Sequence, residues 1–167
     1  MFIVNDSLEI RHGKIRRYAE EEATVGLILA AVDLEWTIRR AILALGKNST
    51  KYIKVQVLSN GKKSGLKHYN NCWRDEVKPI HSIGLPDFID DWQLLINAFE
   101  LRNRLVHGRG VSGEAFTRAR METCLNASEK LAKFAAEHCS PLYGHRIVRI
   151  KPRENCSHCA NLVRSSK

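Results

Sequence analysis

The sequence of 167 residues lacks any hydrophobic run long enough to cross a membrane. Its longest apolar run, residues 25–32, is followed at once by Asp33 and then by Glu35, whereas a membrane-spanning helix needs about 20 apolar residues. The apolar start of the chain meets Asn5 and Asp6 directly after Val4, a pattern unlike that of a secretory signal peptide. The sequence therefore predicts a cytoplasmic protein without a membrane segment.

Acidic residues are outnumbered by basic ones, and the cysteines lack the spacing of a disulfide framework. The chain has 18 Asp and Glu against 27 Lys and Arg, a formal net charge of +9. Such an excess predicts attraction to polyanions, with RNA or DNA first and an anionic membrane second; a basic surface without a partner is the alternative. The five cysteines are an odd number without a disulfide-framework spacing, which favours reduced thiols. The length suits one domain with a real core.

Helical periodicity dominates the sequence that remains. Apolar residues recur every three or four positions in segments 23–45, 86–106 and 114–138, the pattern of amphipathic helices that bury one face. A polar segment before them, residues 5–22, is expected to form a leading helix or arm. Its cations are interpreted as a solvated face or, alternatively, as an RNA-contacting arm: Arg11, His12, Lys14, Arg16 and Arg17. These segments predict an all-α bundle of four to five helices over residues 1–139.

Residues 47–84 are interpreted as a loop-rich insertion in that bundle. Segment 52–58 alternates apolar and polar residues, which favours a strand, although a short helix would suit a bundle. The insertion also mixes aromatic residues with cations, a combination that binds single-stranded RNA through base stacking and phosphate pairing. The aromatic residues are Tyr69 and Trp73, and the cations expected to bind RNA are Lys62, Lys63, Lys67 and Arg74. The alternative is a solvated loop with one buried aromatic residue.

The C-terminal tail, residues 140–167, is strongly basic. From residue 139 onward the chain carries six Lys and Arg against the single acid Glu154. A pair of cysteines, Cys156 and Cys159, has the spacing of two zinc ligands, and a tetrahedral zinc site would need Cys139 and His145 as well. The main expectation is instead an irregular basic tail that binds no metal, so no cofactor is expected.

The stretch from Glu100 to Gly108 has the chemistry to act on a phosphodiester. Asn103 and His107 are four residues apart, so they project from one face of a helix, whereas Arg102 points elsewhere unless the last turn unwinds or a second copy of the chain completes the site. A histidine can take a proton from a ribose 2′-hydroxyl or return one to the leaving oxygen. An arginine can hold the phosphate oxygens as charge builds on them, and neither role needs a metal.

The residues Arg102-Asn103-Arg104-Leu105-Val106-His107 resemble the Arg-polar-x-x-x-His motif of HEPN domains (higher eukaryotes and prokaryotes nucleotide-binding). The resemblance covers roughly residues 17–139. It implies a small helical bundle, and for many members a metal-independent endoribonuclease of a toxin–antitoxin, phage-defence or RNA-guided system. Some members carry a tyrosine two places after the histidine that a partner enzyme modifies. Here that residue is Arg109, so this regulation is not implied, and Arg109 joins the cations expected to bind RNA.

These features together predict a homodimeric endoribonuclease that leaves 2′,3′-cyclic phosphate and 5′-hydroxyl ends. Arg102, Asn103 and His107 are the expected catalytic residues, and an antitoxin or inhibitor protein is a candidate partner. Supporting roles are expected for Glu35, Glu100 and Arg104. Two alternatives stay open: a non-catalytic RNA- or nucleotide-binding module, and a helical scaffold in which Arg102 only pairs with Glu35 or Glu100. Glu35 itself could instead pair with Arg39 at the next turn.

Overall fold

A computed structural model describes residues 6–59, 65–109 and 112–144, and in this part of the chain every regular element is a helix. The all-α prediction is thus confirmed. The elements in chain order are α1 Leu8–Glu21, α2 Ala23–Leu45, α3 Thr50–Tyr52, the π-helical turn η1 Ile53–Val57, α4 Leu66–Glu76, α5 Lys78–His81, the 3-10 turn η2 Leu85–Phe88, α6 Trp92–Val106 and α7 Glu114–Glu137.

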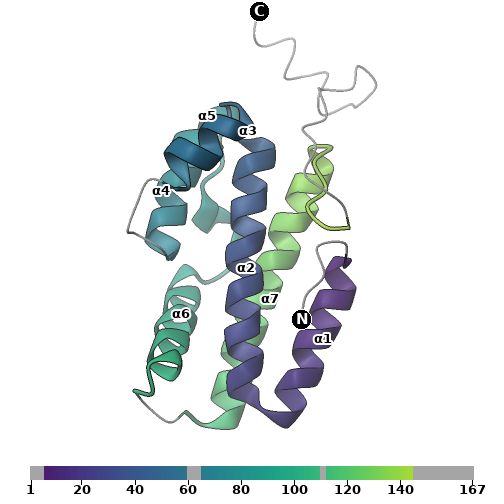
Figure 1. Cartoon of the computed structure of the whole chain (residues 1–167), viewed down its shortest axis with the longest axis vertical. Helices are drawn as coiled ribbons and strands as arrows, with labels where there is room; N and C mark the ends of the chain where they lie inside the picture. The colour runs from purple at the N-terminus through teal and green to yellow at the C-terminus, as the bar shows by residue number, and fades with distance from the viewer. Residues whose placement is uncertain (1–5, 60–64, 110–111, 145–167) are drawn as a thin grey trace, which may run out of the picture.

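Helix α2 is the central element of the bundle. It packs against α7 along most of its length, with α1 on one side and α6 on the other (Figure 1). Its bounds, Ala23–Leu45, are those that the periodicity predicted, and Gly46 is its C-cap residue. The predicted stripe is buried throughout: Leu27, Ala31, Leu34, Ile38, Ala41 and Leu45. No helix in the described ranges is long and apolar enough to cross a membrane.

The crossing of α1, α2 and α7 depends on a small residue at position 26. A Cβ atom on Gly26 would lie 2.4 Å from the Cβ and 3.0 Å from the Cα of Ala19 in α1, and 2.9 Å from Met121 Sδ in α7. Because the Ala19 atoms belong to or adjoin the backbone, they cannot move aside without moving α1. The glycine therefore sets how closely the three helices approach.

The described residues of segment 47–84, namely 47–59 and 65–84, are mostly helical rather than loop-rich. The strand predicted for segment 52–58 is wrong: Thr50–Tyr52 is a short helix that continues into the π-helical turn Ile53–Val57. Both aromatic residues of the predicted basic-aromatic cluster are buried: Tyr69 is 5% exposed and Trp73 is 0% exposed. Trp73 donates a hydrogen bond from Nε1 to the Ile83 carbonyl and packs edge-on against Phe88. These rings attach α4 to the bundle, so they are not free to stack on RNA bases.

The leading helix is also only partly as predicted. Helix α1 forms, but Arg11 and His12 are 3% and 1% exposed instead of lying on a solvated face or contacting RNA. Arg11 Nε lies 2.7 Å from Asp33 Oδ1 in α2. Burial of this arginine is therefore offset by an ion pair with the central helix.

Packing extends beyond residue 139. Leu142 is 1% exposed in the core, and the ring of Tyr143 lies 5.2 Å from the ring of Trp36 in α2. The Tyr143 hydroxyl contacts Thr37 and lies 3.2 Å from Asp33 Oδ2. Burial raises the pKa of Tyr143 strongly, so its hydroxyl stays protonated and can donate to the Asp33 carboxylate.

We predict that Gly26→Ala destabilises the protein. The overlap with Ala19 is expected to cost about 1–3 kcal/mol, as added methyl groups do in packed cores, and this exceeds the gain in helix propensity of up to about 1 kcal/mol. Gly13→Ala is the matched control, since a Cβ on Gly13 in α1 meets nothing within 4 Å, and it should raise stability. Urea unfolding of both variants measures the two changes, and an unchanged midpoint for Gly26→Ala would contradict the packing argument.

Candidate functional site

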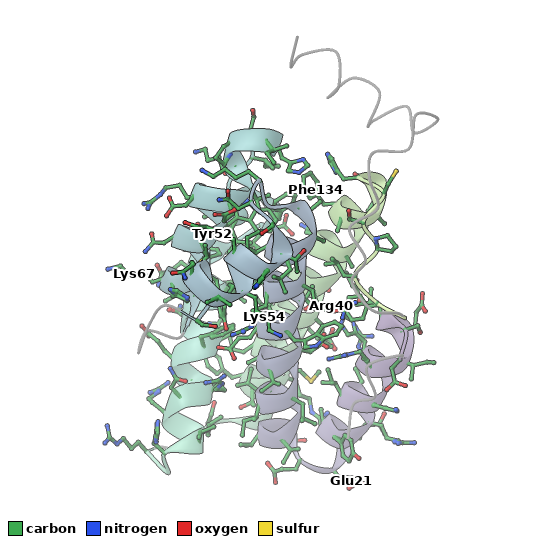
Figure 2. The ribbon with its side chains drawn as sticks, turned by 45° about the horizontal axis from the view of Figure 1, so that its top comes forward. Glu21, Arg40, Tyr52, Lys54, Lys67 and Phe134 are labelled. Carbon is green, nitrogen blue, oxygen red and sulfur yellow. The ribbon has the colours of Figure 1, made fainter. Side chains whose placement is uncertain are left out.

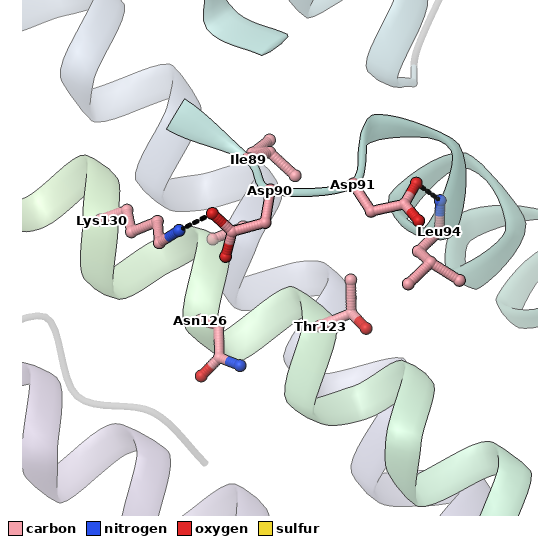
Figure 3. A pocket seen from close by; sticks show the side chains of 8 residues that line it. Ile89, Asp90, Asp91, Leu94, Thr123, Asn126 and Lys130 are labelled. Carbon is pink, nitrogen blue, oxygen red and sulfur yellow. Dashed lines mark hydrogen bonds and ion pairs between the residues drawn. The ribbon is translucent and has the colours of Figure 1, made fainter. Parts of the chain in front are cut away.

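The residues of the predicted motif lie on α6, whose two ends are defined by capping interactions. Asp91 caps the first turn by accepting a hydrogen bond from the Leu94 backbone N–H at 2.9 Å. The helix therefore begins at Trp92, after η2, rather than near Asp87 as predicted. Figure 3 shows this cap beside the start of α6.

The C-terminal end of α6 is closed by a Schellman motif. Gly108 adopts φ +65°, a left-handed conformation that favours glycine. Its N–H donates to the Leu105 carbonyl at 3.1 Å, and the Arg109 N–H donates to the Arg104 carbonyl at 2.7 Å. His107 is consequently the C-cap residue of a continuous helix. The helix thus ends where the predicted segment 86–106 does, and its last turn does not unwind.

Arg102 is held in place by two neighbours. Its Nη2 lies 3.1 Å from Glu35 Oε2 in α2, and its Nη1 donates to Asn103 Oδ1 at 2.8 Å. The side chains of Arg102 and Glu35 are each 21% exposed, so the ion pair is at the edge of the core and reaches solvent. Of the partners predicted for Glu35, Arg102 is thus the one at ion-pair distance, and this contact fits both a supporting role in a site and the scaffold alternative.

Burial governs the titration of the groups around this ion pair. Desolvation raises the pKa of Glu35, and the guanidinium groups of Arg102 and Arg39 lower it by less. Cys124 of α7 is fully buried nearby, and desolvation raises the pKa of its thiol to about 12. Cys124 is therefore a neutral core residue rather than a nucleophile.

The other motif residues are on the surface. Asn103, Arg104 and His107 are exposed, and so is Arg109 immediately after the cap. Asn103 and His107 share a helix face, and the His107 backbone N–H donates to the Asn103 carbonyl at 3.1 Å. On a continuous helix, five residues place Arg102 about 140° around the axis from His107. One copy of the chain brings Arg102, Asn103 and Glu35 together but directs His107 elsewhere.

The residues expected to bind RNA or metal are spread over several places. Lys67 is exposed at the start of α4, and Arg74 is exposed further along it and paired with Asp75 at 2.9 Å. Lys62 and Lys63 lie outside the described residues, as do His145, Cys156 and Cys159 of the predicted zinc site. The remaining zinc candidate, Cys139, is half-buried just after the end of α7. Among the described ranges, no group of three or more His, Cys, Asp or Glu side chains has a metal-binding arrangement.

Two hollows flank α6. One lies between α6 and the start of α4 and has a volume of about 400 Å³; its lining includes Asn103 and Glu100. The other, of about 180 Å³, lies between the α6 N-terminus and α7, and there Asp90 is already paired with Lys130 (Figure 3). The first hollow is larger and adjoins the motif, which makes it part of the candidate site.

Sequence reasoning missed the buried polar cluster on the other side of α2. His12 Nδ1 lies 3.2 Å from Glu129 Oε1. His12 Nε2 lies 3.3 Å from Asp33 Oδ2, which is within ion-pair distance, but the two atoms are not aligned for a hydrogen bond. Arg11 and Arg40 both stack on Trp36, with their guanidinium carbons 4.0 and 4.5 Å from its ring centre. Figure 2 labels Arg40 on the side of α2 toward α1. The sequence feature that could have indicated this cluster is Asp33, an acidic residue inside an apolar helix.

Comparison of the chain with models of known protein families, with curated proteins and with solved structures gives no match. The function must therefore be argued from the residues of the site and their chemistry.

We predict that Glu35→Gln changes how stability depends on pH. A raised pKa in the folded state means that the folded protein binds this proton more tightly than the unfolded chain. The contribution of Glu35 is therefore fully present below its ordinary pKa of 4.5 and is lost as the pH rises through the raised value. The glutamine does not titrate, so the unfolding free energy of the wild type should fall relative to that of Glu35→Gln as the pH rises from about 4 to 7.

Urea unfolding at a series of pH values measures this difference, with Glu137→Gln as the control at an exposed position of α7. A difference that stays constant over the range, or that grows in favour of the wild type with rising pH, would contradict the assignment of Glu35 as a desolvated carboxyl.

Proposed function

We propose that the protein is a metal-independent endoribonuclease of the HEPN type that acts as a homodimer. The observation that carries the proposal is the ordered Arg102–Asn103 pair, held by Glu35, on the same helix that ends at an exposed His107. The net charge of +9 supports RNA as the substrate, because cations neutralise phosphates and release counterions.

The chemistry follows from these side chains. His107 takes the proton of the ribose 2′-hydroxyl, and the 2′-oxygen attacks the adjacent phosphorus. The bond to the 5′-oxygen breaks, and that oxygen receives a proton from an imidazolium, which leaves a 2′,3′-cyclic phosphate and a 5′-hydroxyl. Arg102 stabilises the charge on the non-bridging phosphate oxygens. Asn103 orients the scissile phosphate or the histidine, and Arg104 and Arg109 add cations beside the helix end.

A homodimer would bring together the arginine and the histidine that lie on different sides of the helix in one copy. Arg102 and His107 diverge on the continuous α6, and a two-fold axis near the helix end would place two such pairs in one basic cleft. Exposed apolar residues support an interface at this end of the bundle, where α2 and α7 begin and α6 ends (Figure 1). Val25 is 40%, Val106 54% and Phe116 49% exposed. Exposed apolar side chains at one end of a domain favour burial against a partner.

The Arg102–Glu35 ion pair favours a second candidate function. An arginine whose charge is already paired also suits a scaffold, or a module that binds RNA or nucleotides without cleaving them.

A ribonuclease would need to be inhibited in its host, which is why an antitoxin or inhibitor protein is part of the proposal. Growth arrest on expression, relieved by the His107→Ala substitution, distinguishes the nuclease from the two other functions.

We predict that His107→Ala abolishes RNA cleavage and leaves the fold intact, because the side chain is exposed at the helix cap and contributes little packing. Loss of a general acid–base group is expected to lower the rate by about 10²–10⁴-fold. Arg102→Ala should also abolish cleavage and weaken RNA binding, whereas the control Lys133→Ala, at an exposed position of α7, should do neither. Cleavage is measured with chelator present, on RNA and on a substrate with a single 2′-deoxyribose at the cleaved position. Full activity of His107→Ala, or cleavage at the deoxyribose, would end the proposal.

RNA binding should weaken steeply with salt, whether or not cleavage follows. For single strands, the logarithm of the binding constant falls with the logarithm of salt concentration with a slope of about −0.7 for each phosphate contacted. Affinities measured between about 50 and 200 mM salt with the His107→Ala protein give this slope. Arg109→Ala should reduce its magnitude by about 0.7, and a flat dependence would exclude electrostatic binding.

A further inference from the structure

The hollow between α4 and α6 has an aromatic and aliphatic floor with polar groups at its edges. From α6 it is lined by residues spaced three or four apart on one face: Trp92, Ile96, Phe99, Glu100 and Asn103. From the start of α4 it is lined by Gly65, Leu66, Lys67 and Asn70. Trp92 and Ile96 are half-buried, so the floor is accessible from solvent. Its volume of about 400 Å³ is within the range of small-molecule sites, about 300–1,000 Å³.

This lining matches the chemistry of a nucleobase. A flat heterocycle stacks on aromatic side chains, and its edge forms hydrogen bonds with amide groups. Trp92 supplies an accessible ring at one end of the floor, and Asn70 and Asn103 supply amides from opposite walls. Lys67 lies exposed on the α4 wall (Figure 2), where it can pair with a phosphate.

Asn103 connects the hollow to the catalytic candidates. Its Oδ1 accepts the hydrogen bond from Arg102 Nη1 at 2.8 Å, so the amide nitrogen is the atom left to face a ligand. A base in the hollow would therefore be attached to a ribose phosphate near Arg102. We infer that this hollow is a nucleobase subsite, and that it holds one base of an RNA chain next to the phosphate that Arg102 contacts. The inference rests on the proposed function for the identity of the chain as RNA.

Glu100 adds a preference among the four bases. Its exposed carboxylate lines the hollow and accepts hydrogen bonds only. Adenine, cytosine and guanine each carry an exocyclic amino group that donates to such an acceptor, whereas the donor of uracil is its ring N3–H, which lies between two carbonyl oxygens that repel a carboxylate. The subsite should therefore bind the three amino-bearing bases more tightly than uracil.

Binding is tested with the full-length His107→Ala protein, which should not cut RNA, titrated with AMP, CMP, GMP, UMP and inorganic phosphate. Tryptophan fluorescence reports stacking on Trp92, and equilibrium dialysis reports binding independently. Trp92→Leu should weaken binding by about 5- to 100-fold, the usual effect of losing a stacking platform. Asn70→Asp should also weaken it, because the amide is replaced by a carboxylate that repels the phosphate, and Glu100→Gln should reduce the discrimination against UMP.

The control is Asn126→Asp, the same change of charge in the smaller hollow of Figure 3, and it should leave nucleotide affinity unchanged. Circular dichroism checks that each variant is folded, and if Trp92→Leu does not fold, Asn70→Asp and Glu100→Gln decide the question. Nucleotide affinity that these substitutions leave unchanged, or inorganic phosphate that binds as tightly as AMP, would overturn the subsite. A 2′-O-methyl RNA dinucleotide should bind more tightly than the monophosphates; if it does not, the hollow takes free nucleotides and not RNA.

Cleavage mapping separates failure of the subsite from failure of the proposed nuclease. Protein with His107 intact should cut next to amino-bearing bases, and Glu100→Gln should cut with less preference. If Trp92→Leu and Asn70→Asp cut RNA with the same sequence preference as the protein without these substitutions, the result would contradict the subsite but not the nuclease. If nucleotide binding depends on Trp92 but no RNA is cut, the result would contradict the proposed nuclease but not the subsite.

Discussion

The structure depends on how the central helix accommodates two carboxylates in its apolar middle. Asp33 is completely buried in α2, and Arg11 of α1 neutralises it at 2.7 Å. Glu35, two residues later, points about 200° away around the helix and meets Arg102 of α6 at 3.1 Å. A buried charge without a partner costs several kcal/mol, so each carboxylate restricts which helix can lie on its side of α2.

The two sides of α2 are consequently different. On the Asp33 side Arg11, His12 and Asp33 are buried, and aromatic rings of Trp36 and Tyr143 lie against Arg11. On the Glu35 side the ion pair is 21% exposed and adjoins both the end of α6 and the α4–α6 hollow. The buried side therefore stabilises the bundle, and the accessible side is the one from which a guanidinium can reach a ligand.

The sequence was sufficient for the local elements and insufficient for the long-range pairs. The bounds of α2 and the end of α6 followed from the apolar periodicity, because this pattern depends on residues close together in the chain. Segment 52–58 alternates as a strand does, but Ile53 is needed in the core of a helical bundle, and tertiary packing overrode the local pattern. Arg11 looked solvated because nothing near it in sequence shows that Asp33, 22 residues away, lies beside it. The Glu35–Arg102 pair was expected only as one of several options, since its members are 67 residues apart.

The arrangement around Arg102 also determines how it would meet a phosphate. Nη2 is held by a carboxylate and Nη1 by the neutral amide oxygen of Asn103. A phosphate that approaches from solvent carries a full negative charge, so it competes more readily with the amide than with Glu35. Displacing Asn103 keeps the guanidinium anchored to α2 and turns the amide toward the ligand. In the proposed nuclease, Glu35 would then be a fixed support that orients the arginine, and Asn103 would be the group that exchanges. Such a division of roles would give a physical reason for an asparagine directly after the arginine: its oxygen holds Nη1 in the structure, and its N–H groups would donate to the ligand once a phosphate had taken that place.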